Sequence, residues 1–203
     1  MALERNITAV DGNDPQIRSL YQTTFILTEH PWDDFMELKS LKKLDITAYY
    51  DGDVFVGFTI TYLSHSFIWG WYFAVKEEFR GQGYGQSILS KYLEKYKGKK
   101  VIIDIESPDQ VCDNTELRQR RHAFYLRNGF RDTEVGHSYE GIDYTFMMIG
   151  EGTFTREDYD DIINEFSWLS YIAAKMRLGI IVMKEKAEAM LNYLKVCLHL
   201  STH

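Results

Sequence analysis

An apolar segment, a loop with three glycines and a helical pattern follow one another in this chain. Residues 69–75 are apolar and aromatic, and a short charged link leads from them to Arg80, Gly81, Gly83 and Gly85. Apolar residues then recur at helical spacing, at Ile88, Leu89, Tyr92, Leu93 and Tyr96. A helix N-terminus offers unpaired amides and positive potential, and glycines let the backbone approach an anion closely. The loop therefore predicts a pyrophosphate site, with Arg80 as a fixed positive charge.

Three other interpretations of this glycine loop have to be considered. A tight strand-to-helix turn without a ligand is the simplest. A P-loop is excluded because no Gly-Lys-Ser/Thr follows the glycines. A dinucleotide fold needs Gly-x-Gly-x-x-Gly with an acidic residue at the end of the next strand. Here the glycines alternate with single residues and Asp104 lies in the middle of that strand, so the pattern fits poorly.

The charge of the chain argues against a nucleic-acid partner. The formal net charge is -7 and the pI is about 5.4. The longest basic cluster is the short run at 118–121, whereas nucleic-acid surfaces need an extended basic patch. An acidic balance mildly favours cationic small molecules, and we expect no nucleic-acid partner.

The length and the cysteine content indicate one cytoplasmic domain, or one domain with an appendage. Cys112 and Cys197 lie far apart and have no metal-ligand spacing, so neither a disulfide framework nor a metal site is predicted. The N-terminal residues lack the apolar core of a signal peptide. Residues 166–183 are mostly apolar, but Lys175 and Arg177 near the centre favour a packed amphipathic helix over a membrane span.

The remaining pattern predicts a mixed α/β fold. Hairpin turns are expected at Asp51-Gly52-Asp53 and around Gly141, and the unbroken Val-Ile-Ile at 101–103 indicates a strand buried on both faces. Strands are expected at 6–10, 45–50, 54–64, 67–75, 101–106, 130–135 and 144–149. Helices are expected at 14–27, 32–44, from the glycine loop to 96, at 117–128, from 155 onward and at 187–198, with capping residues at 113–115 and 155–158.

A second motif, Arg-Arg-His-Ala-Phe-Tyr-Leu-Arg-Asn-Gly-Phe, occupies residues 120–130. With both motifs, the chain resembles the GNAT superfamily of acetyl-CoA-dependent N-acetyltransferases. That family has an Arg/Gln-x-x-Gly-x-Gly/Ala loop and a later Tyr-x-x-x-Gly-Phe ending. The matching residues are Arg80, Gly83 and Gly85 in the first motif and Tyr125, Gly129 and Phe130 in the second. Two motifs in this order are more specific than either alone.

The resemblance implies a fold and a division of the chain. It covers residues 5–150 in element order, and the family has a mixed, mostly antiparallel central sheet with splayed strands and flanking helices. We therefore expect a GNAT acetyltransferase domain at 1–150 and a C-terminal helical extension at 151–203. The extension packs on that domain or forms a homodimer interface. Its apolar stripe consists of Met183, Ala187, Met190, Leu194 and Cys197.

The resemblance also implies how acetyl-CoA, the expected co-substrate, is bound. In this family, the strand that corresponds to residues 71–75 pairs its free backbone groups with the pantetheine arm of CoA. The loop amides that correspond to residues 82–85 bind the pyrophosphate. The strands at 71–75 and 101–106 splay apart, and a backbone amide near Phe73 or Ala74 supports the oxyanion. The expected cofactor-binding residues are Phe73, Ala74, Val75, Arg80, Gly81, Gln82, Gly83, Tyr84 and Gly85, and no metal is expected.

Tyr125 is the candidate general acid for the CoA sulfur that leaves. A thiol with a pKa of about 8.5 can take a proton from a phenol with a pKa of about 10 when the two are in contact. The alternative is a core tyrosine beside Phe124.

Glu106 is the candidate general base, because an alkyl amine is almost fully protonated at pH 7 and must lose a proton before it attacks. Period-two alternation places Asp104 and Glu106 on one face, with Glu106 at the strand end. The alternative is a strand-end carboxylate paired with Arg120 or Arg121. His65, on a predicted turn, is a weaker base candidate.

The second motif departs from the family at two places. Many members have Asn seven positions before the tyrosine and Ala four positions before it, where this chain has Arg118 and Arg121. The asparagine contact to the cofactor is therefore not expected. The two arginines either reach a CoA phosphate or are solvated charges on the helix.

A small-molecule primary amine is the expected acceptor. Trp32, Phe67, Trp69, Trp71 and the 139–144 hairpin combine aromatic rings with acidic neighbours. Such groups hold cationic amines through cation–π and ionic contacts, although the same rings also suit a core. A protein or peptide amine is the alternative acceptor, and a non-catalytic acyl-CoA-binding regulatory module is the alternative class.

Overall fold

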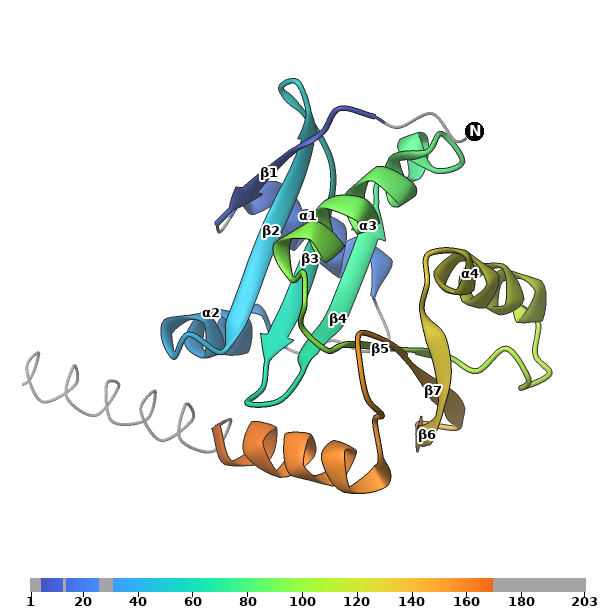
Figure 1. The fold of residues 1–203 in the computed structure, drawn as a ribbon. Coiled ribbons are helices and arrows are strands. Elements are labelled where there is room, and N and C mark those ends of the chain that lie inside the picture. Colours follow the sequence, from blue (N-terminus) through green and yellow to red (C-terminus); the bar gives the residue numbers. More distant parts are fainter. Residues whose placement is uncertain (1–4, 13, 26–30, 170–203) are drawn as a thin grey trace, which may run out of the picture. The chain divides into compact units, whose positions relative to one another are not determined.

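The computed structural model describes residues 5–12, 14–25 and 31–169 (Figure 1). The chain divides into a unit of residues 1–163 and a second unit of residues 164–203. The expected domain boundary at 150 stays a prediction. The expected helix at 187–198 and the apolar stripe at 183–197 lie outside the described residues. None of the described helices is both long and apolar enough to cross a membrane.

A mixed sheet forms the centre of the first unit. Within the described residues it has seven strands in the order β1-β2-β3-β4-β5-β7-β6. All neighbouring strands are antiparallel except β4 and β5, which are parallel. This confirms the expected mostly antiparallel sheet. The strands are β1 (Thr8–Asp11), β2 (Leu44–Asp51), β3 (Val54–Leu63), β4 (Ile68–Val75), β5 (Val101–Glu106), β6 (Arg131–Tyr139) and β7 (Ile142–Ile149).

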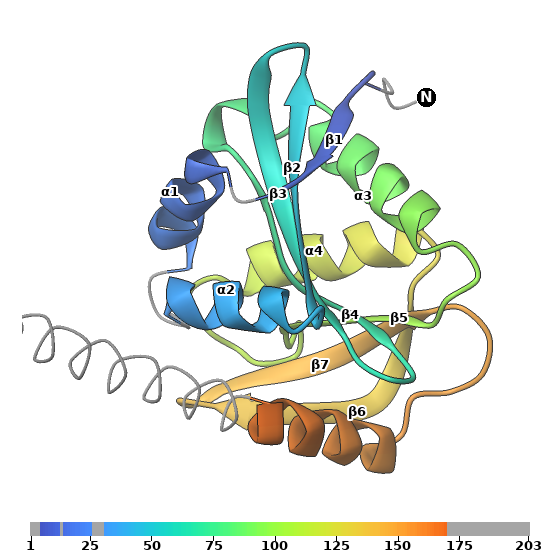
Figure 2. The same ribbon diagram turned by 90° about the vertical axis from the view of Figure 1, so that its left-hand side faces the viewer.

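Helices flank both faces of this sheet, as expected. Figure 2 shows α1 and α2 on one side of strands β2 to β4 and α3 on the other. Tyr21 of α1 and Phe35 of α2 both contact the ring of Tyr72 on β4. On the opposite face, Leu89 of α3 and Tyr125 of α4 share one buried cluster with residues of β5. The helices are α1 (Pro15–Thr24), α2 (Trp32–Ser40), the 3-10 helix η1 (Glu77–Phe79), α3 (Tyr84–Lys95) and α4 (Thr115–Arg127), and a further helix begins at residue 156.

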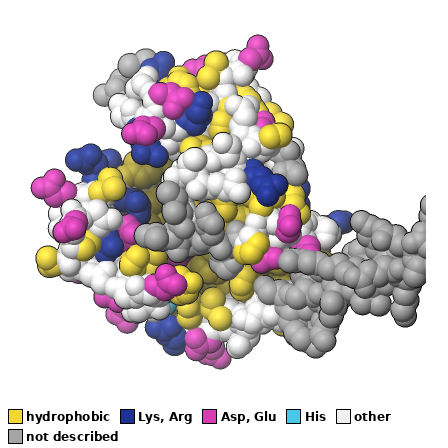
Figure 3. All heavy atoms as spheres, turned by 180° about the vertical axis from the view of Figure 1, so that it is seen from behind, with side chains coloured by type: hydrophobic (Ala, Val, Ile, Leu, Met, Phe, Trp, Pro, Cys, Tyr) yellow, Lys and Arg dark blue, Asp and Glu magenta, His cyan; other side chains and the backbone are white. Residues whose placement is uncertain are grey.

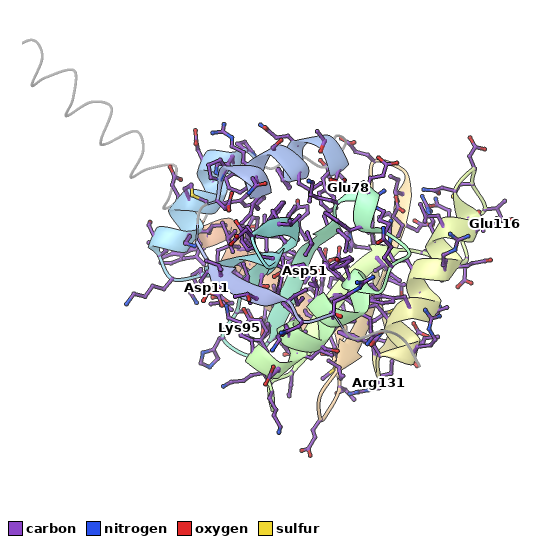
Figure 4. All side chains as sticks on the ribbon, turned by 90° about the horizontal axis from the view of Figure 1, so that it is seen from above. Asp11, Asp51, Glu78, Lys95, Glu116 and Arg131 are labelled. Carbon is purple, nitrogen blue, oxygen red and sulfur yellow. The ribbon has the colours of Figure 1, made fainter. Side chains whose placement is uncertain are left out.

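An ion pair ties the end of α3 to the first strand. The Nζ of Lys95 lies 2.9 Å from Oδ1 of Asp11, and Figure 4 shows these two labelled side chains close together. Lys95 also lies 3.3 Å from Oδ2 of Asp45 on β2. Since Lys95 is in the last turn of α3, its charge also suits the negative end of the helix dipole.

Side-chain caps form at the start of α1 and at the start of the helix after residue 155. The Oδ1 of Asp14 accepts from the N–H of Gln16 at 2.8 Å. Thr155 and Asp158 form a reciprocal capping box, with N–H to side-chain distances of 2.8 and 3.2 Å. In the expected segment 113–115, Asn114 is the N-cap of α4, but its side chain makes no hydrogen bond to the helix.

Two element boundaries differ clearly from expectation. The helix expected at 32–44 ends at Ser40, because Leu44 is buried as the first residue of β2. Strand β6 continues to Tyr139 instead of ending at 135, because it pairs with β7 up to the contact of Tyr139 with Ile142. The first difference shows sheet burial overriding helical periodicity, and the second brings residues 136–139 into the sheet.

Buried tyrosines make the fold sensitive to alkaline pH. Burial raises the pKa of Tyr49 and of Tyr125 from 10.0 to about 12, and it also raises the pKa of Tyr92 and Tyr96. Since the folded chain holds these protons more tightly, the stability they contribute is complete below about pH 10 and is lost as pH rises through the folded-state pKa values. We expect the unfolding midpoint to fall between about pH 10 and 12 in a thermal melt series, and Tyr49→Phe to make that fall shallower.

The exposed Tyr139 supplies the control for this series. Tyr139→Phe removes a hydroxyl from an exposed ring and should leave the unfolding midpoint at neutral pH as it is in the wild type. An unfolding midpoint that stays level up to pH 12 would contradict the assignment.

Candidate active site

Strands β4 and β5 separate partway along their length. They pair at only three positions, which end at Gly70 and Ile103, and the rest of both strands is not paired between them. A register shift in the β3–β4 pairing leaves Trp71 as an extra residue on β4. Such a bulge bends its strand. Because the bulge follows Gly70 directly, it explains why β4 turns away from β5 at this point.

The separation opens into a cleft of about 1130 Å³. Residues of β4, β5, α1, α4 and the glycine loop line it. On the face shown in Figure 3, Lys and Arg side chains gather around a hollow with a hydrophobic floor. The lining residues include Phe73, Ala74, Val75, Arg80, Gly85 and Tyr125 from the predicted site.

The free edge of β4 presents backbone groups to this cleft. The N–H of Lys76 donates to the carbonyl of Val56 on β3 at 2.9 Å. In an antiparallel pair, alternate residues direct their backbone groups away from the partner. It follows that Phe73 and Val75 face the cleft with their backbone and that Ala74 faces β3. Of the two amides considered for the oxyanion, only that of Phe73 has the right direction.

The glycine loop ends at the exposed N-terminus of α3. Gly81 and Gly83 have φ values of +73° and +90°, which glycine adopts without strain. Gly83 is the N-cap of α3 and has no side chain to bond the first amides, which therefore stay available for an anion. The next residue, Tyr84, is fixed by a 2.6 Å hydrogen bond from its hydroxyl to Asp51. Glu78 lies beside this loop in η1 (Figure 4).

The lining of the cleft carries more positive than negative charge. Arg80 donates from Nε to the carbonyl of Val75 at 3.1 Å, which holds its guanidinium at the loop. The cationic side chains are Lys76, Arg80, Arg120, Arg121 and Arg127, and the acidic ones are Glu77, Glu78 and Asp104. An excess of cations, together with the amides of α3, suits a polyanionic ligand.

Tyr125 combines a buried ring with a hydroxyl at the cleft. The residue is 7% exposed, and its ring packs against Phe124 and Phe130. Within the described part of the chain its hydroxyl has no hydrogen-bond partner. Burial raises its pKa to about 12, with smaller effects from Arg121, which lowers it, and Asp104, which raises it. The hydroxyl is therefore protonated at neutral pH and can donate a hydrogen bond into the cleft.

The two sequence motifs meet in space. A Cβ at Gly85 would lie 3.9 Å from the ring of Phe124, so the loop and α4 are in van der Waals reach. The side-chain amide of Gln86 also donates to Asn128 at the end of α4. The glycine loop and α4, which carries Tyr125, are therefore in contact beside the same cleft.

Glu106 lies in an ion-pair network and does not line the cleft. Its Oε2 is 3.2 Å from Arg121 and 3.5 Å from Nε of Arg118. Arg118 is 4% exposed and donates to Gln110 at 2.8 Å, so it is neither a solvated charge nor directed at the cleft. Arg120, one of the two partners considered for Glu106, lines the cleft instead.

A polar cluster that the sequence did not reveal surrounds Asp104. Asp104 lines the cleft; its Oδ1 accepts from Nε1 of Trp69 at 2.8 Å, and its Oδ2 lies 3.2 Å from Nε2 of His137. His137 is on the part of β6 beyond the expected strand end. An alternating pattern extended through 139 would have placed it in the sheet. By contrast, His65 is on an exposed turn, and His122 pairs with Asp132 at 2.6 Å.

The aromatic residues that were expected to contact the acceptor do not all line the cleft. Trp71 lines the cleft, where its ring lies 5.6 Å from that of Trp69. Trp32 is buried against Tyr21 and Phe35, and Phe67 is buried against Phe154. In the 139–144 hairpin, Tyr144 stacks on His137 with ring centroids 4.8 Å apart. Trp32 and Phe67 are therefore core residues.

The chain is similar to known proteins in sequence over part of its length and in fold over most of it. Residues 44–132 match the sequence model of the acetyltransferase (GNAT) domain. No curated protein sequence matches the chain. Among solved structures, a protein assigned to the GNAT acetyltransferase family from Bacteroides thetaiotaomicron is 22% identical, with a TM-score of 0.63, over 79% of this chain and 94% of that chain.

Two other similar structures contain CoA or an analogue. Arabidopsis thaliana Naa50 in complex with the bisubstrate analogue CoA-Ac-MVNAL is 14% identical, with a TM-score of 0.56, over 71% of this chain and 99% of that chain. A Bacillus subtilis acetyltransferase in complex with CoA is 15% identical, with a TM-score of 0.52, over 72% and 98%. At these identities the likeness establishes the fold.

Proposed function

We propose that this chain, which carries a GNAT acetyltransferase domain, transfers the acetyl group of acetyl-CoA to a primary amine. The matched residues 44–132 include the glycine loop, both separated strands and Tyr125. The observation that supports the proposal is that residues of these parts, Tyr125 among them, line one cleft beside the separated strands. If the glycine loop were only a tight turn without a ligand, the loop, the two strands and Tyr125 would have no reason to line the same cleft.

The cleft provides complementary groups along the length of acetyl-CoA. The amides at 82–85, the N-terminus of α3 and Arg80 suit the pyrophosphate. The outward backbone groups of Phe73 and Val75 suit the amides of the pantetheine arm, as an added strand would. The remaining proposed contacts are Ala74, Gly81, Gln82 and Tyr84. Arg120 and Arg127 on α4 add positive charge at the same cleft.

The residues at the opening can assist each stage of the transfer. The amine nitrogen attacks the thioester carbon, and the carbon–sulfur bond breaks as the new carbon–nitrogen bond forms. The N–H of Phe73 is placed to stabilise negative charge on the carbonyl oxygen. The hydroxyl of Tyr125 is placed to stabilise the sulfur and to pass it a proton. Because the pKa of Tyr125 is about 12, full proton transfer from its hydroxyl to the CoA sulfur is less favourable than transfer from an ordinary phenol. Burial also raises the pKa of a thiol, which offsets part of this difference.

The proposed acceptor is a small-molecule amine, with a peptide amine as the alternative. Trp71 lines the cleft and gives a flat apolar surface beside Asp104, which suits a cationic amine with an apolar body. The peptide alternative is supported by the fold shared with Naa50, whose structure holds CoA-Ac-MVNAL. A regulatory module that binds acyl-CoA without turnover is the alternative from another class.

Thiol release from acetyl-CoA tests the proposal. The panel should contain alkyl amines, aromatic amines and short peptides, and CoA binding should be measured separately by calorimetry. Acetylation of small amines supports the proposal, and faster turnover of peptides favours the peptide alternative. CoA binding without thiol release for any acceptor would indicate the non-catalytic module and sink the enzymatic proposal.

A further inference from the structure

We propose that Asp104 binds and deprotonates the acceptor amine, and that Trp69 and His137 hold its carboxylate in position for this. The inference rests on the proposed function and assigns the proton acceptor to a residue other than Glu106. It also names the acceptor class, which is an alkyl amine that arrives as an ammonium ion. Three observations carry it: the place of Asp104 on β5, its hydrogen bonds and its charge environment.

Asp104 lies where the cleft opens, on the side opposite Tyr125. It is the first residue of β5 after the last β4–β5 pair, Gly70 with Ile103. Ile103 and Ile105 belong to the buried cluster that contains Tyr125. Because side chains alternate along a strand, Asp104 projects to the other face. An acyl carbonyl held in the opening would then have Tyr125 on the side of its sulfur and Asp104 on the side from which an amine approaches.

The carboxylate of Asp104 is held by donors from two distant parts of the chain. The indole Nε1 of Trp69 can only donate, so Oδ1 accepts this hydrogen bond at 2.8 Å. Nε2 of His137 is 3.2 Å from Oδ2. Each carboxylate oxygen accepts more than one hydrogen bond, so both keep capacity for the hydrogens of an ammonium group. With 13% of its side chain exposed, Asp104 is well shielded but open to the cleft.

His137 is itself fixed by stacking. Its ring lies 4.8 Å from that of Tyr144 at an interplanar angle of 4°, and 5.8 Å from that of Tyr159 at 18°. Two nearly parallel neighbours restrict rotation of the imidazole. His137 therefore acts through Asp104, as a positioning residue.

The surrounding charges distinguish Asp104 from Glu106. Two guanidinium groups already neutralise Glu106. Among the described residues, no lysine or arginine forms an ion pair with Asp104, and the imidazole of His137 lies 3.2 Å from its Oδ2. Asp104 can therefore offer its negative charge to an incoming cation, and it directly follows the last paired residue of β5, Ile103.

The proton balance of the step is complete without another reactant. The ammonium gives one proton to the carboxylate of Asp104, which leaves a neutral amine with a free electron pair. After attack on the thioester carbon, the hydroxyl of Tyr125 gives its proton to the departing sulfur, which ends as a thiol, and the second proton lost by the nitrogen restores that hydroxyl. Asp104 returns its proton to water. The net products are the acetamide, CoA thiol and one proton.

Two acceptor probes separate this role from a structural one. 2-Phenylethylamine is an ammonium ion at neutral pH, whereas aniline is neutral and needs no deprotonation before attack. We expect Asp104→Asn to lower kcat/KM for 2-phenylethylamine by about 10²–10³-fold and that for aniline by less than about tenfold, with CoA affinity unchanged. His137→Phe keeps the stacking and removes the nitrogen, so a smaller loss confined to 2-phenylethylamine is expected.

The matched control is Asp132→Asn. Asp132 also pairs with a histidine, His122, but does not line the cleft, so both probes should react at the wild-type rate. Equal losses for both probes in Asp104→Asn, no loss at all, or a loss specific to 2-phenylethylamine in Glu106→Gln instead would overturn the inference. So would a wild-type enzyme that accepts aniline and rejects 2-phenylethylamine. A wild type that binds CoA but acetylates neither probe nor any panel amine counts against the proposed function itself.

Discussion

Tyr125→Phe is expected to lower kcat for acetyl transfer by about 10²–10³-fold while CoA binds with unchanged affinity. The substitution removes one hydroxyl, and the ring contacts with Phe124 and Phe130 that hold α4 in place remain. The lost donor acts on the sulfur only as negative charge develops there, so the effect appears in kcat and not in binding. Single-turnover thiol release and calorimetry with CoA measure the two quantities.

Tyr96→Phe is the control for this prediction. Tyr96 belongs to the same buried cluster, but its hydroxyl donates to Asp45 at 2.6 Å and does not line the cleft. That variant should lose some stability and keep the wild-type rate constant for the chemical step. A Tyr125→Phe enzyme that turns over at the wild-type rate would remove Tyr125 from the mechanism and leave it as a core residue.

Gly83→Ala is expected to weaken CoA binding by about tenfold or more. Gly83 has a φ of +90°, where an L-residue costs about 1–2 kcal/mol, and a factor of ten in affinity corresponds to about 1.4 kcal/mol. The chain can relieve the strain by moving the loop, which displaces the first amides of α3 from the anion. Calorimetric titration with CoA measures the loss.

Gly98→Ala separates strain from loss of the binding site. Gly98 has a φ of +77° in the turn after α3, and an added Cβ there would meet nothing within 4 Å. It should therefore lose a similar amount of stability and keep wild-type affinity for CoA. Equal affinity losses in both variants would show that strain weakens binding indirectly, and unchanged affinity in Gly83→Ala would remove the loop from the pyrophosphate site.

Much of the fold could be predicted because local patterns agree with the tertiary contacts. The unbroken apolar run at 101–103 became β5, buried on both faces, with the expected bounds Val101–Glu106. The predicted ends of helices and strands were wrong where long-range contacts determine them. Leu44 continues a helical pattern, but it is buried in β2, and β6 extends past 135 because β7 offers partners up to Ile142.

The candidate site could be predicted in part. Glycines at positive φ and Tyr125 belong to short motifs whose spacing is visible along the chain. The sequence did not indicate which carboxylate of β5 faces the opening between β4 and β5. Alternation places Asp104 and Glu106 on the same face, and the choice depends on the β4–β5 pairing ending at Ile103 and on α4 delivering Arg118 and Arg121 to Glu106.

The sequence alone determined the mixed fold, the glycine loop at a helix start and the candidate acid Tyr125, because each depends on residues close together along the chain. Only the tertiary structure decided the burial of Arg118, the raised pKa of Tyr125 and the joining of Trp69, Asp104 and His137. These features bring together side chains of β4, β5, β6 and α4, which are far apart along the chain. Their hydrogen bonds and desolvation depend on strand register and on a bulge, which no local pattern specifies.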